Sequence, residues 1–377
     1  MKACHRCLGL ALLATIICFS LWNPALAADP SETAPQEPKP QKVKGPIQAP
    51  PYFIHTPPDK LDLCGEPVPL NLPFVAEMLD REFTIAVYDQ AQMVMWLKRA
   101  SRYFPYISKR LEEADLPNDL KYLAVAESAL LKRIRSVAGA VGLWQFIPGT
   151  GRRYGLRRNR WFDDRHNPEK STQAAIAYLK DLHAKFGSWT LAMAAYNCGE
   201  SRVEREIKEQ GVNDYYHLYL PRETMRYVYR ILSAKIILSD PGRYGYVLPK
   251  SHLYQPIPAD RVTLKLGRPL HLRQLATASG STVRELKELN PEIRGYYLPR
   301  GTQAIKIPKG KSPQVAAKLQ TLGPGPQPKN SEWVVKSGDT LSFIAKQNGV
   351  SIAALRRANG ISGSRLMPGQ RLIIPDR

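Results

Sequence analysis

The first candidate for chemistry in this sequence is Glu127, a single carboxylate in a segment that otherwise has an apolar helix pattern. The residues that share its helical stripe are Leu120, Leu123, Ala124 and Leu131. Desolvation on an apolar face favours the protonated form of a glutamate and raises its pKa. Such a side chain can hold a proton near neutral pH and donate it to a leaving oxygen, as a general acid does. The alternatives are that Glu127 is solvated, or that it forms a buried ion pair with a nearby arginine.

Helices must position this glutamate, because helical spacing of apolar residues dominates between about residues 71 and 240. The pattern predicts helices at residues 90–113, 118–133, 171–186 (closed by Gly187), 190–196 and 222–238, with Asn118 as the N-cap of the second. Residues 139–160 form a loop that is rich in Gly and Arg and contains Trp144 and Phe146. Long loops on a helical scaffold often carry function.

An internal repeat begins after residue 250, with a constant offset of 69 residues. Leu272, Leu275, Ala276, Gly280, Leu286 and Asn290 correspond to Leu341, Ile344, Ala345, Gly349, Leu355 and Asn359. Each copy ends in an alternating apolar segment, at residues 303–308 and 370–375, which predicts the order strand, two short helices, strand. Residues 311–331 include a Gly-Pro-Gly-Pro-Gln-Pro run, which predicts a linker between the copies.

The first residues have the features of an export signal. A basic start precedes an apolar run at residues 8–22, and the small residues Ala25 and Ala27 form a signal peptidase site. We expect the mature chain to begin at Ala28 and to continue as a Pro-rich flexible segment to residue 51. The apolar run is shorter than the ~20 residues that a membrane-spanning helix needs, so the mature protein is expected to be exported and soluble.

The predicted export signal determines how the cysteines are interpreted. Cys4 and Cys7 form a C-x-x-C motif, but both lie in the segment to be removed, so no metal or redox site is expected there. A lipid anchor on Cys18 is the alternative to a soluble protein. Cys64 and Cys198 remain in the mature chain, where an oxidising compartment would allow them to pair. Two free thiols are the equal alternative.

The formal net charge is +21, and it is +19 once Lys2 and Arg6 are removed with the signal. This balance predicts an anionic partner. The arginine-rich residues 152–160 would suit nucleic acid, but the export signal argues against it. Peptidoglycan and lipid surfaces are the anionic partners outside the cytoplasm. The histidines show no metal-binding spacing, so neither a metal nor another cofactor is expected.

Four motifs follow one another around Glu127. They are Glu127-Ser128, the Gly-Ala-Val-Gly-Leu-Trp-Gln-Phe-Ile-Pro-Gly-Thr-Gly run of residues 139–151, Ala195-Tyr-Asn197, and Glu223-Thr-Met-Arg-Tyr-Val228. In this order they resemble the lytic murein transglycosylases with a goose-lysozyme-like fold, and in particular the membrane-bound D type. The resemblance implies cleavage of the β-1,4 bond between N-acetylmuramic acid (MurNAc) and N-acetylglucosamine (GlcNAc) without water. Glu127 would act first as acid and then as base, leaving a 1,6-anhydro-MurNAc end.

The resemblance also implies contacts to the sugar chain. The implied substrate-binding residues are Ser128, Gly142, Gln145, Tyr196, Asn197 and Tyr227. Five of these have a structural alternative. Ser128 can bond back to its own helix, Gly142 can shape a turn, Tyr196 and Tyr227 can be core aromatics, and Asn197 can cap a helix.

The second copy of the repeat resembles a lysin motif (LysM), a βααβ module that binds glycans containing GlcNAc. The implied glycan-binding residues are Gly338, Asp339, Thr340 and Ile361. The first copy departs from this pattern, since Pro269, Leu270 and His271 stand in place of the first three. Sugar binding by the first copy is therefore in doubt.

Two other functions compete with this one. A hydrolytic muramidase would need a second carboxylate to activate water, and Asp163 and Asp164 are the candidates. Otherwise these aspartates cap the approach to the next helix or pair with Arg165. A non-catalytic protein that binds the cell wall is the second alternative, and the presence of Glu127 argues against it.

The sequence therefore predicts a multidomain protein with a mainly α, lysozyme-like catalytic domain and two small α+β (βααβ) modules. The expected parts are a signal peptide (1–27), a Pro-rich segment (28–51), an extension packing on the catalytic domain (52–94), the catalytic domain (95–248), a degenerate LysM-like module (255–310), a linker (311–331) and a LysM module (332–377). The expected partner is peptidoglycan, bound by a monomer in the periplasm or cell envelope, with membrane association left open.

Overall fold

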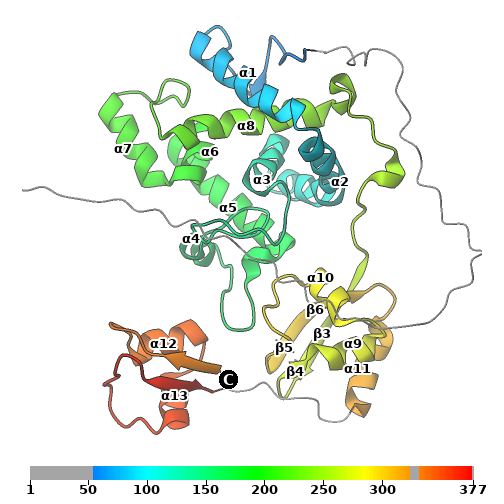
Figure 1. The fold of residues 1–377 in the computed structure, drawn as a ribbon, viewed down its shortest axis with the longest axis vertical. Helices are drawn as coiled ribbons and strands as arrows, with labels where there is room; N and C mark the ends of the chain where they lie inside the picture. The colour runs from blue at the N-terminus through cyan, green and yellow to red at the C-terminus, as the bar shows by residue number, and fades with distance from the viewer. Residues whose placement is uncertain (1–53, 323–330, 376–377) are drawn as a thin grey trace, which may run out of the picture. The chain divides into compact units, whose positions relative to one another are not determined.

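The computed structural model describes residues 54–322 and 331–375 (Figure 1). The predicted signal peptide and the Pro-rich segment lie outside these residues, as do Cys4, Cys7 and Cys18. No helix in the described ranges has both the length and the apolar character that crossing a bilayer requires.

A helical domain contains the region around Glu127. Its helices are α1 (Pro73–Tyr88), α2 (Gln90–Glu112), α3 (Lys121–Ser128), α4 (Pro148–Arg153), α5 (Pro168–Phe186), α6 (Trp189–Cys198), α7 (Glu200–Gln210) and α8 (Arg222–Ser239). Helix α8 contacts α1, α3 and α6, so it lies at the centre of the domain. The predicted helices at residues 90–113, 171–186, 190–196 and 222–238 are confirmed to within a few residues.

Helix α5 illustrates how local sequence sets these limits. Its N-cap is Asn167, whose side chain accepts hydrogen bonds from two backbone N–H groups of the first turn, and Pro168 occupies the first helical position. The helix therefore starts three residues before the predicted position. It ends at Gly187, which has φ +68° in the left-handed region, as the sequence predicts.

The predicted helix at residues 118–133 is wrong at both ends. Asn118 is not the N-cap; Pro117 precedes a short 3₁₀ turn (Asn118–Leu120), and α3 then ends at Ser128. Ala129 and Leu130 have φ +49° and +59°, which turns the chain out of the helix. Leu131, which the predicted stripe included, lies beyond this turn and is 37% exposed, whereas Leu130 is buried by the packing of the loop. Glu127 consequently lies in the last turn of α3.

Three helices of the helical domain were not predicted, α1, α4 and α7, together with a small hairpin of β1 (Asp62–Leu63) and β2 (Glu66–Pro67). Helix α4 lies within residues 139–160, which were predicted as a loop. Helix α1 is joined to α8 by a buried carboxylate. Glu82 is only 4% exposed and accepts hydrogen bonds from Arg226 Nε at 2.6 Å and from Arg230 Nε at 3.4 Å. Buried charges need such partners, so this network fixes the position of α1 on α8.

The two repeat copies have the predicted order of strand, two helices, strand. In the first repeat module (residues 259–322), β3 (Ala259–Leu266) pairs antiparallel with β6 (Gly301–Pro308), and α9 (Leu272–Ser279) and α10 (Val283–Leu289) lie between them in sequence. A short pair, β4 (Leu270–His271) and β5 (Tyr297–Leu298), is additional. In the second repeat module (residues 331–375), β7 (Ser331–Val334) pairs with β8 (Arg371–Ile374) around α12 (Leu341–Asn348) and α13 (Ile352–Asn359).

The linker prediction for residues 311–331 is wrong in its first half. Residues there form α11 (Ser312–Thr321), which contacts α9 and β3. Val315 of this helix is 1% exposed in the core of the first repeat module. The Pro-Gly run that suggested a linker begins only at residue 323, outside the described residues.

Candidate active site

A cleft of about 780 Å³ lies over the C-terminal end of α3. Its walls come from α3, the loop at residues 136–147 (the cleft loop), α4, α5, α6 and α8. The residues with polar or aromatic side chains that line it are Glu127, Ser136, Gln145, Phe146, Thr150, Tyr178, Tyr196, Asn197, Cys198, Glu223, Tyr227 and Arg230. The structure thus brings four of the sequence-predicted substrate residues together with Glu127.

Glu127 has the protonation behaviour that the sequence predicts. Burial raises the pKa of its carboxyl from 4.5 to about 7. A hydrogen bond from the Tyr227 hydroxyl to Oε1 opposes this shift, the charge of Glu223 adds to it, and the Arg230 guanidinium reduces it. The carboxyl is therefore close to half protonated at neutral pH, which suits a group that must both donate and accept a proton.

Tyr227 and Tyr196 stay neutral in this setting. Burial, strengthened for both by the nearby Glu127 carboxylate, raises the pKa of each phenol well above its ordinary value. Tyr227 therefore remains a hydrogen-bond donor to Glu127. The Tyr196 hydroxyl donates to the carbonyl oxygen of Trp144 at 2.7 Å, so this ring holds the cleft loop in addition to lining the cleft.

The two predicted amides are held by neighbours on different elements. Gln145 donates from Nε2 to the carbonyl oxygen of Gly142 at 2.9 Å and has φ +45°, a left-handed conformation that is costly for a residue with a side chain. Asn197, near the end of α6, accepts a hydrogen bond on Oδ1 from Thr224 Oγ1 of α8 at 2.8 Å. Both line the cleft, so their remaining polar atoms can face a ligand.

Ser128 and Gly142 are positioned differently from the prediction. Ser128 is 3% exposed, and its hydroxyl bonds to the carbonyl oxygens of Leu143 at 2.8 Å and Ala124 at 3.1 Å. A Cβ on Gly142 would lie 2.1 Å from the carbonyl oxygen of Arg165, and its φ of +85° also favours glycine. Neither residue lines the cleft, so the predicted sugar contacts have no support in this geometry. Both instead hold the cleft loop against the rest of the domain.

Trp144 completes the anchoring of the cleft loop. Its side chain is fully buried, and its Nε1 donates to Thr172 Oγ1 of α5 at 2.9 Å. A buried indole that reaches a hydrogen-bond partner fixes both the position and the orientation of its backbone. The loop that carries Gln145 is therefore a rigid wall of the cleft.

Asp163 and Asp164 do not line the cleft. Burial opposes the ionisation of Asp163, but two hydrogen bonds from the Arg165 guanidinium, at 2.8 and 2.7 Å, outweigh it and hold the pKa below its ordinary value. Asp164 pairs with Lys170 Nζ at 2.9 Å. Both carboxylates are thus occupied in ion pairs. The pairing with Arg165 is the expected alternative and holds for Asp163, whereas the Lys170 partner of Asp164 was not predicted.

Sequence reasoning assigned no role to two charged residues of the cleft, Glu223, which begins the fourth motif, and Arg230. With Tyr227 they stand at positions i, i+4 and i+7 of α8, which lie on one face of a helix. That spacing was present in the predicted helix at residues 222–238, and Tyr227 had already been chosen from it. Selecting the polar residues one helical turn before and one turn after Tyr227 would have identified both.

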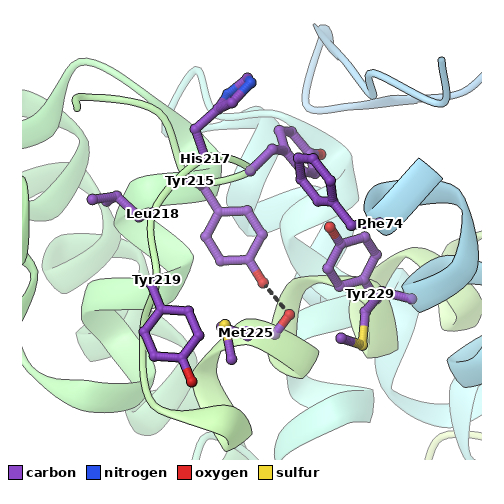
Figure 2. A pocket seen from close by; sticks show the side chains of 9 residues that line it. Phe74, Tyr215, His217, Leu218, Tyr219, Met225 and Tyr229 are labelled. Carbon is purple, nitrogen blue, oxygen red and sulfur yellow. Dashed lines mark hydrogen bonds between the residues drawn. The ribbon is translucent and has the colours of Figure 1, made fainter. Parts of the chain in front are cut away.

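A second cavity of about 320 Å³ lies on another face of α8 (Figure 2). Figure 2 shows that aromatic side chains surround it, including Phe74 of α1 and Tyr215, Tyr219 and Tyr229. The Tyr215 hydroxyl donates to the carbonyl oxygen of Met225 at 2.7 Å. No carboxylate lines this cavity, so it lacks a proton donor of the kind found in the cleft.

Cys64 and Cys198 are free thiols in the structure. Burial is the main cause that raises the pKa of each above its ordinary value. They are therefore poor nucleophiles. Within the described ranges, no group of three or more His, Cys, Asp or Glu side chains could hold a metal ion.

The residues predicted to bind glycan in the second repeat module have structural contacts there. Gly338 has φ +84°, and Asp339 Oδ2 accepts from Trp333 Nε1 at 2.8 Å and from the backbone N–H of Lys336 at 2.9 Å. Thr340 caps α12 through the N–H of Phe343. Ile361 packs partly buried against the core of the module. The glycan contacts of these residues stay a prediction.

Comparison with known proteins places three domain models on this chain. The Transglycosylase SLT domain matches residues 105–219, the LysM-like domain of lytic transglycosylase MltD matches residues 260–323, and the LysM domain matches residues 334–375. The chain is 36% identical over 292 residues to membrane-bound lytic murein transglycosylase D of Escherichia coli (strain K12), covering 73% of this chain and 64% of that protein. It thus spans just under two thirds of that relative.

Two further similarities cover smaller parts. Over 86 residues the chain is 38% identical to peptidoglycan transglycosylase gp16 of Escherichia phage T7, covering 22% of this chain and 6% of that protein. Among solved structures, the 70 kDa soluble lytic transglycosylase SLT70 of Escherichia coli matches with a TM-score of 0.32 and 18% identity, covering 47% of this chain and 33% of that one.

Proposed function

We propose that the chain is a lytic transglycosylase, which cleaves the MurNAc–GlcNAc β-1,4 bond of peptidoglycan without water. The chain matches a transglycosylase SLT domain, an MltD LysM-like domain and a LysM domain. The observation that carries the proposal is Glu127, a carboxyl with a pKa of about 7 in a cleft whose other predicted contacts are neutral donors and acceptors. One group with that pKa can serve both halves of the reaction.

In the first step, protonated Glu127 donates its proton to the glycosidic oxygen. The C1–O bond of MurNAc breaks, and the GlcNAc leaves with a free 4-hydroxyl. The acetamido carbonyl oxygen of the same MurNAc bonds to C1 and takes up the positive charge that develops there. The Tyr227 hydroxyl, bonded to Glu127 Oε1, stabilises the carboxylate that results.

In the second step, the Glu127 carboxylate removes the proton from the 6-hydroxyl of that MurNAc. The 6-oxygen bonds to C1 as the bond from the acetamido oxygen to C1 breaks. The product is a 1,6-anhydro-MurNAc end, and Glu127 is protonated again. In this proposal Gln145, Tyr196 and Asn197 orient the sugar, because each lines the cleft with neutral polar atoms that leave the pKa of Glu127 in place.

Mass spectrometry of the muropeptides released from purified peptidoglycan tests the proposal. The expected products are one water lighter than those of hydrolysis, and Glu127→Gln should release about 10³-fold less of them. Reducing MurNAc ends would instead show hydrolysis. Binding of peptidoglycan with no release would favour a non-catalytic wall-binding protein.

One observation favours hydrolysis as the second candidate. Glu223 is another carboxylate lining the cleft, and a glycosidase that uses water needs two. If reducing ends appear and Glu223→Gln abolishes them, Glu223 activates the water. The same variant should leave anhydro products in place if Glu127 acts alone.

The rest of the chain suits a cell-envelope enzyme. A net charge of +19 after removal of the predicted signal, which carries Lys2 and Arg6 of the +21 total, attracts the protein to the carboxylates of peptidoglycan, and this attraction should weaken with salt. In the proposal the second repeat module binds glycan and so raises the local concentration of substrate for the cleft. Export to the periplasm or cell envelope, and action as a monomer, belong to the same proposal.

A further inference from the structure

The first repeat module shares its hydrophobic core with the helical domain. Trp161 and Phe162, which belong to the loop before α5, are 7% and 2% exposed in the same cluster as Leu272, Ile293 and Leu298 of the module. Two large aromatic side chains of one domain thus complete the core of the other. Burial of each side chain stabilises this contact about as much as burial of a core side chain stabilises a single domain.

The backbones of the two parts also pair. Phe162 and Ile293 form an antiparallel bridge. On either side of it, the N–H of Asp163 donates to the carbonyl oxygen of Glu292 at 2.8 Å, and the N–H of Arg294 donates to the carbonyl oxygen of Trp161 at 2.9 Å. A short β-ladder therefore sets the register between module and domain.

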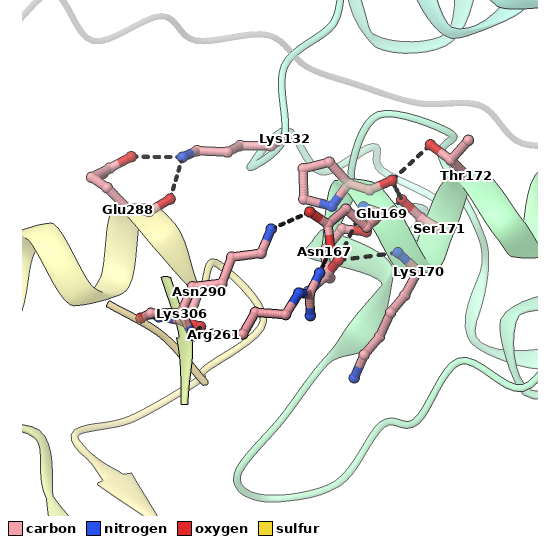
Figure 3. Close-up of polar contacts among 11 residues, drawn as sticks. Lys132, Asn167, Glu169, Lys170, Ser171, Thr172, Arg261, Glu288, Asn290 and Lys306 are labelled. Atoms are coloured by element: carbon pink, nitrogen blue, oxygen red, sulfur yellow. Dashed lines mark hydrogen bonds and ion pairs between the residues drawn. The ribbon is translucent and has the colours of Figure 1, made fainter. Parts of the chain in front are cut away.

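Ion pairs flank this ladder (Figure 3). Glu169, in the first turn of α5, accepts from Lys306 at 2.5 Å and also pairs with Arg261, both of them on strands of the module. Lys132 lies 2.8 Å from a Glu288 carboxylate oxygen. Burial opposes ionisation of Glu169, but the two cations outweigh it and hold the pKa of its carboxyl below the ordinary value. The docking is thus polar at its edges and apolar at its centre, as stable interfaces are.

The docked segment continues directly into the support of the cleft. The Arg165 guanidinium donates hydrogen bonds from Nε and Nη2 to the two carboxylate oxygens of Asp163. The remaining terminal nitrogen of Arg165, Nη1, donates to the carbonyl oxygens of Gly139 at 3.0 Å and Phe146 at 2.9 Å. Arg165 is 3% exposed, so these bonds are not exchanged with water. Phe146 and Gln145, its neighbour, line the cleft.

A second connection reaches the other side of the same loop. His166 Nδ1 lies 3.0 Å from the carbonyl oxygen of Lys132, in the stretch that follows Glu127 and α3. Lys132 itself is paired with Glu288 of the module. Lys132, between α3 and the cleft loop, and Gly139 and Phe146, within the cleft loop, are therefore all bonded to residues 165 and 166, which directly follow the docked segment.

The repeat offset shows which position the module uses for this contact. Glu292 corresponds to Ile361, one of the predicted glycan contacts of the second copy, at the offset of 69 residues. Glu292 is 5% exposed, and its carbonyl oxygen is bonded to the helical domain. In the first copy this position therefore faces protein.

We propose that the first repeat module is a positioning element of the active site, which holds the cleft loop in its working shape through Phe162, Asp163 and Arg165. The inference rests on the proposed function, because part of its test measures cleavage activity. It predicts that the module contributes to turnover of soluble substrates, which need no attachment to the wall. A module that served only as a wall binder would leave that turnover unchanged.

The test uses full-length variants and a soluble, uncrosslinked glycan fragment of peptidoglycan. Glu169→Arg reverses the charge that faces Arg261 and Lys306, and Phe162→Ala removes the apolar centre of the docking. Both should lower kcat by about tenfold or more while KM changes little, since small displacements of a catalytic wall are costly. Adding Arg261→Glu and Lys306→Glu to Glu169→Arg should restore most of the loss. Arg371→Glu, in the second repeat module, is the matched control and should have no effect.

Hydrogen exchange of the same proteins gives a readout that does not depend on activity. Loosening of the ladder should raise exchange at Asp163 and Arg294 and, with it, exchange in the cleft loop, while α5 and α8 stay protected. The decisive variant is the one with the largest increase in exchange at Asp163 and Arg294. If its kcat and its cleft-loop exchange nevertheless match those of the unmodified protein, the inference is overturned. If the unmodified protein does not cleave the fragment at all, the proposed function fails, and the exchange result still judges the coupling.

Discussion

The two copies of the repeat keep the same internal frame but differ in the residues just after their second helix. Asn290 and Asn359 are equivalent: each donates from Nδ2 to a carbonyl oxygen of the preceding helix and to one of the closing strand, Lys306 or Ile373. Two residues later the copies diverge. Glu292 of the first contacts the helical domain through its backbone, whereas Ile361 of the second packs against its own module.

The cores of the copies show the same contrast. The first completes its core with α11 and with two aromatic residues of the helical domain, whereas the second is built around its own Leu341, Ile344 and Leu355. A repeat can therefore preserve its fold while a few residues at one edge change what it binds. If this is right, variants in the different parts should separate chemistry, attachment and stability.

The largest expected effect belongs to neither copy. Glu127→Gln should reduce cleavage by about 10³-fold, because the amide can neither donate nor accept the proton in the reaction. Turnover of a soluble fragment measures this, and co-sedimentation with insoluble peptidoglycan should be unchanged. Glu204→Gln, an exposed glutamate of α7, is the control for loss of a carboxylate. Substantial cleavage by the Glu127 variant would assign the chemistry elsewhere.

Removal of residues 331–377 should affect attachment and spare chemistry. We expect binding to insoluble peptidoglycan to weaken by about 10²-fold, the low end of what a linked second site contributes. The kcat on soluble fragments should stay the same, in contrast to the docking variants of the first module. Co-sedimentation and fragment turnover measure the two effects on one protein. An equal loss of kcat would mean that both copies support the cleft.

The equivalent asparagines allow a matched comparison of stability. Asn290→Ala and Asn359→Ala each remove the same side-chain bonds and leave backbone groups unpaired, at a cost of about 1–3 kcal/mol. Because the first module shares its core with the helical domain, Asn290→Ala should lower the melting temperature of that domain. Asn359→Ala should affect only the second module. Calorimetry with hydrogen exchange as the regional probe distinguishes the two, and identical behaviour would contradict the shared core.

The smallest effect concerns pH. Cleavage that needs protonated Glu127 should decline as pH rises through about 7, the pKa of this carboxyl. The charge of Glu223 raises that pKa and Arg230 lowers it, so Glu223→Gln should move the decline to lower pH and Arg230→Gln to higher pH. Wall binding by the second module should show neither displacement. The pH profile of kcat on a soluble fragment measures both, and opposite shifts would reverse the assigned roles.

Within the helical domain, the sequence predicted well what depends on local pattern. The apolar periodicity located α2, α5, α6 and α8, and the apolar face of α3 identified Glu127. It failed where packing overrides the pattern. Beyond Ser128, Leu130 is buried by a loop while Leu131 is 37% exposed, so the apolar pattern does not mark a helix face there. Helix α1 was missed, although its Glu82 accepts a hydrogen bond from Arg230, which lines the cleft.

The chain by itself determined its modular order, the residue types of the cleft and the carboxyl that can carry the proton, since these follow from motifs and from periodicity. Only the tertiary structure decided that Ser128 and Gly142 support the loop, that Asp163 and Asp164 are bound in ion pairs, and that the first repeat module pairs with Phe162 in the loop before α5. The reason is physical. The pKa of Glu127, the exposure of a hydroxyl and the partner of a charge depend on atoms that are tens of residues away in sequence and become neighbours only when the chain folds.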